Sequence, residues 1–357
     1  MTWVRSLLSC ASPALPPQLV LLAKLIALAW IVTGHVLVVP GPFLPFWPWL
    51  DGLPPGLAQV LLQGVMWGAC LHILLARDVP KAAFILGLTI LIAVAWSRPW
   101  FSYNRMYTGL ILVMVGLHGL GGTGALRPVW VQRQAGLVFC GAALDKLLQP
   151  DWRAGQVLAS LLHDIAGRGA LWAPGQAVDV PLAAGALDAV FRCAPWTACA
   201  LSVGVIAGEM LVGIACILAW RRAAVAGIVV FEVATTAVTG STMGMFFHAM
   251  SATTLAFVLW PAPGSVRFDP GRASHRGLRR VVGVLDADGQ WLWRAGPGDL
   301  AVTQDGGMAS GAQAARVVLQ CLPALWLLTA FVLATPAFQP LLPALLAAVW
   351  LAIWRRK

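Results

Sequence analysis

One stretch decides the fold: Ala142-Ala143-Leu144-Asp145-Lys146-Leu147-Leu148-Gln149-Pro150-Asp151-Trp152-Arg153-Ala154-Gly155. It closes an apolar run that begins near Trp130, and it sets an acid beside a base where a helix should end. A lysine there either extends its amine to the membrane interface or holds it in a desolvated site, where a neutral amine acts as a base. Helix neighbours point about 100° apart, so Asp145 need not face the same site as Lys146.

The composition defines the class of protein. The 357 residues are 59% hydrophobic and 11% charged, whereas an average soluble domain is about 25% charged. We therefore predict a polytopic helical membrane protein, with the lipid bilayer as its surroundings. Eighteen tryptophans suit aromatic belts at the membrane interfaces. Basic loops on one side of the membrane account for the net charge of +10, so no nucleic-acid partner is expected.

Apolar windows of about 20 residues mark the expected membrane spans. Eight of them form the expected bundle: Leu19–Val39, Leu57–Leu75, Ala82–Trp96, Met106–Leu120, Trp130–Leu147, Thr197–Trp220, Ala223–Val238 and Met243–Trp260. Two later apolar runs, Ala314–Ala334 and Leu341–Trp354, would raise the count to ten. The expected fold class is an all-α polytopic membrane bundle with a small cytoplasmic α+β segment.

Basic residues in the connections predict the orientation. Arg221-Arg222, the arginines after the eighth span and the terminal Arg355–Lys357 all fall on one face by alternation. We expect that face to be cytoplasmic, with both termini there, in a bacterial-type inner membrane. The Lys146 corner then lies on the outer side. Three parts are expected: a bundle over 1–262, a cytoplasmic segment over 263–313 and hydrophobic helices over 314–357.

The polar segment after the bundle carries strand and turn signals. Val281–Leu285 has the β-branched composition of a strand. Asp286–Gly289 is typical of a turn, and Gln290–Arg294 alternates in the manner of a hairpin partner. We therefore expect a β-hairpin there.

The only glutamates of the chain, Glu209 and Glu232, fall inside the sixth and seventh expected spans. An ionisable group in hydrocarbon costs roughly 3 kcal/mol on insertion scales, so it usually has a purpose. Each either fastens two helices through a hydrogen bond or ion pair, or faces a polar cavity. Thr235, Thr236 and Thr239 share a helix face with Glu232, which suits a cavity wall or hydroxyl contacts between helices.

Other polar candidates lie at or inside the spans. His248 and Ser251 share a face of the eighth span, where a histidine is either a satisfied bundle residue or part of a site. Arg105 opens the fourth span from the outer side beside Asn104 and Tyr107, as an anion partner or an interface anchor. The seven cysteines form no Cys-x-x-Cys pair and are expected to be buried, inert thiols. No metal site is expected.

The Lys146 corner resembles the HTTM family, the transmembrane region of vitamin K-dependent γ-glutamyl carboxylases and their bacterial relatives. That family carries a Gly-x-x-Lys … Asp-Trp … Gly corner, and Gly141, Lys146, Asp151-Trp152 and Gly155 are similar to it, with two extra residues before the lysine. Its next landmarks, a span glutamate and then a basic turn, are similar to Glu209 and Arg221-Arg222. The resemblance covers about Leu19 to Pro261, including an upstream Trp-x-x-Asn-His-x-Tyr landmark similar to Trp100–Tyr107.

This resemblance implies a function. In the carboxylases the matching lysine acts as base toward a reduced quinone, so Lys146 is expected to be that base, assisted by Arg105, Glu209, Glu232 and His248. A reduced quinone is the possible cofactor, with Asn104, Tyr107 and Trp152 expected to hold it. Arg105 and Glu232 stand where the family has histidines, and a guanidinium cannot titrate as an imidazole does. We therefore expect a quinone- or lipid-linked reaction other than carboxylation.

The polar segment resembles a second family, the DCC family of thiol-disulfide oxidoreductases. The run Val266–Arg276 is similar to its opening, Phe-Asp-Gly-x-Cys-x-x-Cys-Arg, and Gly311–Arg316 with Leu322-Pro323 is similar to its second half. The two cysteine positions hold Arg272 and His275. Dithiol exchange needs two sulfurs, so this segment is expected to lack redox activity.

Two other functions stay open. The same ionisable groups would form structural pairs in a non-catalytic membrane scaffold or maturation partner, which would bind another membrane protein. A DoxX-like electron-transfer subunit is the third alternative, because that family has a similar Gly-x-x-Lys corner and a glutamate that opens a span.

Overall fold

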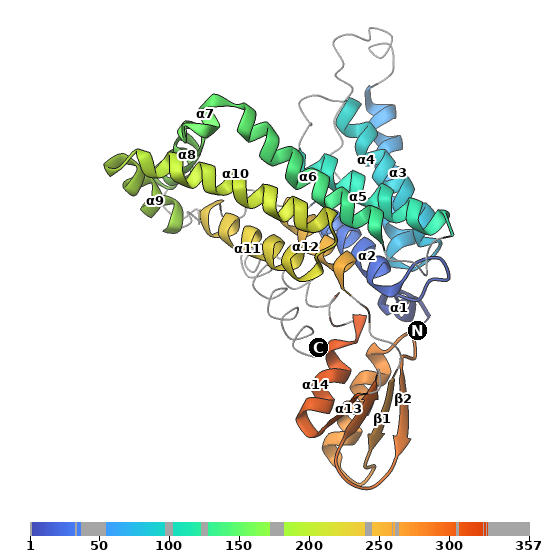
Figure 1. The fold of residues 1–357 in the computed structure, drawn as a ribbon. Helices are drawn as coiled ribbons and strands as arrows, with labels where there is room; N and C mark the ends of the chain where they lie inside the picture. The colour runs from blue at the N-terminus through green and yellow to red at the C-terminus, as the bar shows by residue number, and fades with distance from the viewer. Residues whose placement is uncertain are drawn as a thin grey trace.

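A helical bundle stands on a small α/β module in the computed structural model (Figure 1). The structure describes residues 2–32, 34–36, 55–96, 103–122, 128–171, 182–239, 245–258, 260, 264–304, 307–323, 325 and 327. The bundle contains α1 (Thr2–Leu8), α2 (Pro17–Val32), α3 (Pro55–Leu74), α4 (Val79–Trp96), α5 (Tyr103–Leu120), α6 (Val129–Leu148), α7 (Pro150–Arg153), α8 (Gln156–Leu171), α9 (Leu182–Cys193), α10 (Trp196–Ile217), α11 (Arg221–Thr239), α12 (Met245–Thr253) and the 3-10 helix η4 (Thr254–Phe257).

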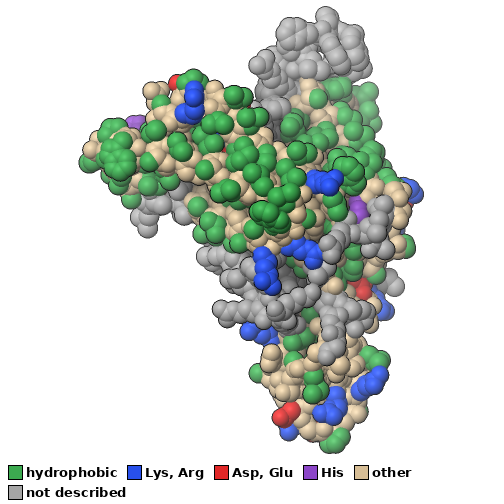
Figure 2. Space-filling model, viewed as in Figure 1, with side chains coloured by type: hydrophobic (Ala, Val, Ile, Leu, Met, Phe, Trp, Pro, Cys, Tyr) green, Lys and Arg blue, Asp and Glu red, His purple; other side chains and the backbone are tan. Residues whose placement is uncertain are grey.

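Within the described ranges, three helices are long and apolar enough to cross a membrane: Gly56–Leu74, Val79–Trp96 and Trp196–Ile217. Pro17–Val32 and Arg105–Leu120 are apolar but shorter. Hydrophobic side chains cover much of the visible bundle surface (Figure 2). Leu211 and Leu148 of the bundle are 67% and 70% exposed. Hydrocarbon surroundings account for so much exposed apolar surface. The expectation of a membrane-compatible helical fold with a small sheet is thus confirmed.

Glycines let α6 and α10 lie close together. A Cβ on Gly136 would stand 2.6 Å from the carbonyl oxygen of Gly213, and one on Gly213 would stand 2.8 Å from the amide nitrogen of Cys140. Small residues of this kind permit close helix packing in membranes, where burial of apolar surface drives no association. The close packing of these two helices bears on the candidate site, because α6 carries Lys146 and α10 carries Glu209.

The eighth expected span is not one continuous helix. The α-helix ends at Thr253, the next four residues form η4, and Val258 is extended. Side chains satisfy the groups at this break: Thr254 Oγ1 donates to the Ser251 carbonyl at 2.6 Å, and Gln132 Nε2 donates to the Ala256 carbonyl at 2.7 Å. Such satisfaction is required where irregular backbone is buried in a membrane bundle.

The α/β module comprises β1 (Gly264–Phe268), α13 (Ala273–Leu285), β2 (Trp291–Ala295), β3 (Ala301–Gln304), β4 (Gly307–Ser310) and α14 (Gly311–Gln320). The strand order is β2-β1-β3-β4. β1 and β2 are parallel, and the other two pairs are antiparallel. Apolar side chains of α13 and α14 pack with those of the sheet in a separate core that includes Phe268, Val282 and Val318.

The expected hairpin is wrong in its first strand and in its pairing. Val281–Leu285 forms the last turns of α13, because Leu278, Val282 and Leu285 recur at helical spacing and pack into the module core. That burial outweighs the strand preference of the valines. The turn is confirmed, since Gly289 has φ +65° and the Asp286 carboxylate accepts from the amides of Gln290 and Trp291.

The first part of the apolar run expected at Ala314–Ala334 belongs to the α/β module. This part is α14, which buries Ala314, Val317 and Val318 in the module core, so the module continues past residue 313. The stretch 328–357, with the expected run Leu341–Trp354, lies outside the described residues.

The module is joined to the start of the chain. The segment Ser9–Pro16, between α1 and α2, meets the turn before β2: Asp288 accepts from the Ser9 hydroxyl and, at 2.8 Å, from the Cys10 amide. Arg5 Nε donates to the Ala287 carbonyl at 3.1 Å. Lys24 is fully buried and donates to the carbonyls of Ser6 and Leu7 at the end of α1. Burial raises the pKa of the Cys10 thiol to about 12, so this thiol stays protonated.

Candidate functional site

Lys146 and Glu209 form a buried ion pair between α6 and α10. The amine donates to both carboxylate oxygens at 2.6 Å. The Lys146 side chain is 18% exposed and that of Glu209 is 4% exposed. Two charged groups so far from water are held by their mutual attraction, and removal of either leaves the other uncompensated. Asp145 is exposed and takes no part.

The corner after Lys146 is clamped onto the first turns of α10. Ser202 Oγ donates to the Trp152 carbonyl at 2.5 Å, and Cys199 Sγ lies 3.1 Å from the Arg153 carbonyl. Gly155 has φ +76°, and a Cβ there would stand 2.5 Å from the Cys199 amide nitrogen. Only glycine fits both conditions. The clamp brings the Trp152 ring to 5.3 Å from the Lys146 amine, a cation–π distance.

Glu232 occupies a second, different polar site. Its side chain is 1% exposed, and Oε2 accepts from the Ser251 hydroxyl at 2.6 Å. Oε1 has no hydrogen-bond partner in the part of the chain that the structure describes. The fully buried Tyr107 lies within electrostatic range of Glu232 and donates to Thr253 Oγ1 at 2.9 Å. This cluster is built by α5, α11 and α12.

The other expected site residues are placed less completely. Arg105 is half-buried in the first turn of α5. Asn104 and His248 lie on α5 and α12, but their side chains are outside what the structure describes. Thr235 donates to the Phe231 carbonyl of its own helix, so its hydroxyl hydrogen does not point toward a cavity. Lys146, Glu209 and Trp152 therefore form one group, and Tyr107 and Glu232 form another.

Several site residues were missed from the sequence. Ser202 and Thr253 look like ordinary small polar residues in apolar helices, and only the fold shows what they contact. Gln132 is equally inconspicuous. Lys24 gave a clear sequence signal that was missed. A lysine in the middle of an apolar helix needs a partner.

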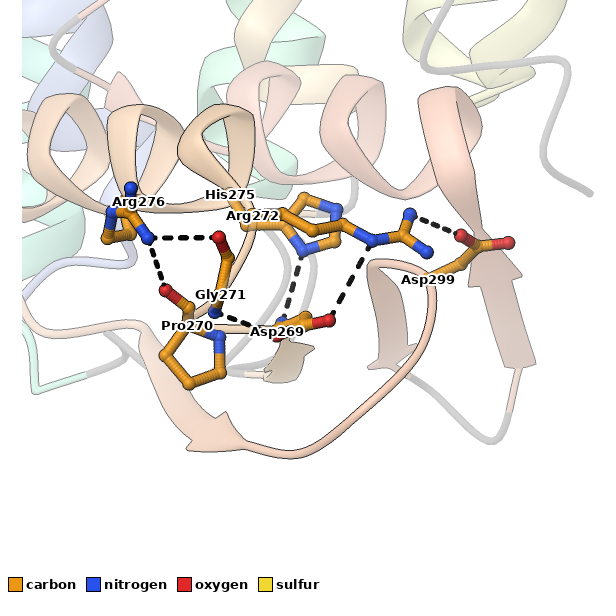
Figure 3. A network of polar contacts seen from close by, with 7 residues as sticks. All are labelled: Asp269, Pro270, Gly271, Arg272, His275, Arg276 and Asp299. Atoms are coloured by element: carbon orange, nitrogen blue, oxygen red, sulfur yellow. Dashed lines mark hydrogen bonds and ion pairs between the residues drawn. The ribbon is translucent and has the colours of Figure 1, made fainter.

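The distal end of the α/β module carries a polar network at the start of α13 (Figure 3). Arg272 Nη1 donates to Asp299 at 2.7 Å, and Arg276 donates to the carbonyls of Pro270 and Gly271. The Asp269 amide donates to His275 Nδ1 at 3.1 Å, which places the proton of a neutral ring on Nε2. The positions similar to the DCC cysteines thus contain a closed network of charged and polar side chains.

No family model, curated protein or solved structure matches the chain. Among the described residues, no group of three or more His, Cys, Asp or Glu side chains could hold a metal ion. What the fold and sites define is a class: a helical bundle compatible with a membrane, with a buried Lys–Glu pair and an attached α/β module.

Proposed function

We propose that this protein is a multi-pass, HTTM-type membrane enzyme in which Lys146 and Glu209 exchange a proton with a reduced quinone or a lipid-linked substrate. The observation that supports it most is the amine at the rim of the bundle, 18% exposed and held by a carboxylate that is 4% exposed. On the same two helices, Leu148 of α6 and Trp196 of α10 are 70% and 72% exposed. A substrate dissolved in lipid would meet this amine without crossing water.

The chemistry follows from the pair. Proton transfer from Lys146 to Glu209 leaves a neutral amine, which can take the proton of a substrate hydroxyl. A positioned carboxylate next to an amine permits this exchange without bulk water. The aromatic face of Trp152, 5.3 Å from the amine, fits a flat ring or a cation at the same place. A bound quinol would supply the hydroxyl and two electrons, and an oxidant dissolved in the medium, such as dioxygen, would accept those electrons. Asn104, Arg105 and His248 remain predicted contributors, whereas Tyr107 belongs to the separate group around Glu232.

The finer topology belongs to the same proposal. We infer eight spans, up to ten, in a bacterial-type inner membrane, with both termini and the α/β module in the cytoplasm. The contact of Asp288 with Ser9 and Cys10 supports it, because the start of the chain and the module then lie on one side. Cysteine labelling from the two sides of inverted and right-side-out vesicles tests it at Arg222 and Asp151. Labelling of both from the same side would contradict it.

The experiment that tests the activity compares wild type, Lys146→Ala and Asp145→Ala in detergent. With dioxygen as the electron acceptor, we expect wild type and Asp145→Ala to oxidise a reduced quinone, and Lys146→Ala to lose at least tenfold in rate. Because Lys146→Ala also leaves Glu209 unpaired, the double variant Lys146→Met, Glu209→Leu is the stability control. Absence of quinol oxidation in the wild type, with any of several quinol head groups, overturns the proposal.

The rival function is a non-catalytic scaffold, and one observation favours it: both oxygens of Glu209 are already taken up by Lys146. In a scaffold the pair only joins α6 to α10, so an apolar pair of similar volume should replace it without loss. Unchanged partner binding by the double variant, together with an inactive wild type, would establish the scaffold.

The α/β module is proposed to be a redox-inactive DCC-like domain. Thiols at the start of a helix are activated as thiolates, but here Arg272 and His275 occupy those positions. We expect no exchange with a dithiol reporter. Exchange activity that maps to residues 266–310 would refute this.

A further inference from the structure

The Glu232 cluster carries an inference that does not depend on the reaction at Lys146. A buried carboxylate normally has a cation or several hydrogen-bond donors to offset the loss of water. Glu232 has one donor, Ser251 Oγ at 2.6 Å, and its Oε1 is buried with no hydrogen-bond partner among the described residues. No ion pair involves Glu232 within those residues, whereas Glu209 has one with Lys146.

The described groups near Glu232 are uncharged. From α5 comes Tyr107, whose phenol donates to Thr253 on α12. Cys216 of α10 lies within electrostatic range of the same phenol and is fully buried as a thiol. His248 precedes Ser251 by one helical turn, and only its backbone is described. An ionised Glu232 would therefore sit among hydroxyls and apolar side chains, at a cost far above that of the neutral acid.

The cluster lies where the eighth span changes from α-helix to 3-10 helix, at Thr253 and Thr254. A 3-10 turn at the end of a helix leaves backbone carbonyls that need other donors. Hydroxyls already occupy two of the carbonyls: Thr253 donates to Ala249, and Thr254 donates to Ser251. A proton on the carboxyl needs no carbonyl ligands.

We propose that Glu232 is a neutral carboxylic acid and a proton-exchange site inside the bundle, with Ser251 as the fixed donor to Oε2 and Oε1 as the oxygen that carries the exchangeable proton. The proton leaves Oε1 for a water molecule or polar ligand that enters at the helix break, and Oε2 keeps its bond from Ser251. No oxidant or reductant is needed. The substrate class of the site is the proton itself.

Infrared difference spectroscopy of the purified full chain tests this. At neutral pH we expect a carbonyl-stretch band of a protonated carboxylic acid, which moves to lower frequency in heavy water. The band should be absent from Glu232→Gln and present in Glu209→Gln. Ser251→Ala should keep the band but move it to higher frequency, because the hydrogen bond to Oε2 is lost; this variant serves if Glu232→Gln does not fold.

Two results overturn the proposal. One is a wild-type spectrum without such a band at neutral pH, or with a band that survives Glu232→Gln. The other is a melting temperature that rises with sodium chloride but not with choline chloride, and does so only while Glu232 is present. That result would mean that a bound sodium ion, and not a proton, neutralises the carboxylate.

Discussion

Glu209 and Glu232 lie on adjacent helices, α10 and α11, and both carboxyls are buried, but their partners differ in kind. Glu209 receives the amine of Lys146 at 2.6 Å on each oxygen, near the rim of the bundle. Glu232 receives one hydroxyl hydrogen, from Ser251, at a break in the neighbouring helix. The first arrangement suits a pair of charges and the second suits a neutral acid.

A buried acid needs a partner, and the two sites show that this partner can be either an amine or a hydroxyl. A lysine can serve Glu209 because α6 ends there, so its long side chain reaches the carboxylate while the helix end stays near the interface. At Glu232 the hydroxyl of Ser251 takes the place of the amine. The substitutions below should separate a charged pair from a neutral acid, and they are ordered by the size of the expected effect.

Lys146→Ala should have the largest effect. It leaves Glu209 as an unpaired buried charge, which costs about 3–5 kcal/mol. The apparent melting temperature in detergent measures the loss, and Asp145→Ala, at an exposed neighbour, should stay within about 0.5 kcal/mol. A Lys146→Ala protein as stable as wild type at neutral pH would contradict the expected cost of an unpaired charge at Glu209.

Removal of the charge from each glutamate compares the two sites directly. Glu209→Gln leaves the Lys146 amine without its anion, so we expect a loss of about 2 kcal/mol. Glu232→Gln keeps a carbonyl oxygen for Ser251 and removes no ion pair, so its loss should be below about 1 kcal/mol. Melting curves of the two variants, recorded side by side, measure the difference. Equal losses would contradict the contrast between the sites.

Ser251→Ala should also have a small effect. It removes the single hydrogen bond to Glu232, worth about 1 kcal/mol. Ser202→Ala is the matched control at the other site, since it too removes one hydroxyl bond, to the Trp152 carbonyl. Only Ser202→Ala should alter the rate of quinol oxidation, because that bond positions the ring beside Lys146. The same rate change in both variants would argue against separate sites.

Much of the helical framework could be predicted from apolar windows, because α3, α4 and α10 lie close to runs that are long and uncharged. The importance of Lys146 and Glu209 was also visible, since each is an ionisable group in or beside an apolar run. Their pairing was not, because it depends on how α6 and α10 cross 63 residues apart in sequence. Side-chain contacts of this kind follow from packing geometry, which leaves little trace in local sequence.

The errors have physical causes too. Val281–Leu285 looks like a strand locally, but its helical spacing against the module sheet decides the outcome. The threonine stripe beside Glu232 stays a prediction, as a cavity wall or as hydroxyl contacts between helices, although Thr235 also donates to its own helix. Met243–Trp260 looked like one uniform span because hydropathy does not register a change from α-helix to 3-10 helix.

The joint between Ser9 and Asp288 has a consequence for how the protein is made. Lys24 lies within 18 residues of its acceptors and can bind them as soon as α2 is synthesised, but Asp288 follows Ser9 by 279 residues. At about 5–20 residues per second, that interval lasts roughly 15–55 s. During this time the Ser9 hydroxyl and the Cys10 amide lack their acceptor. A chain cut short before the module would keep them exposed, so the joint distinguishes a finished copy from an incomplete one.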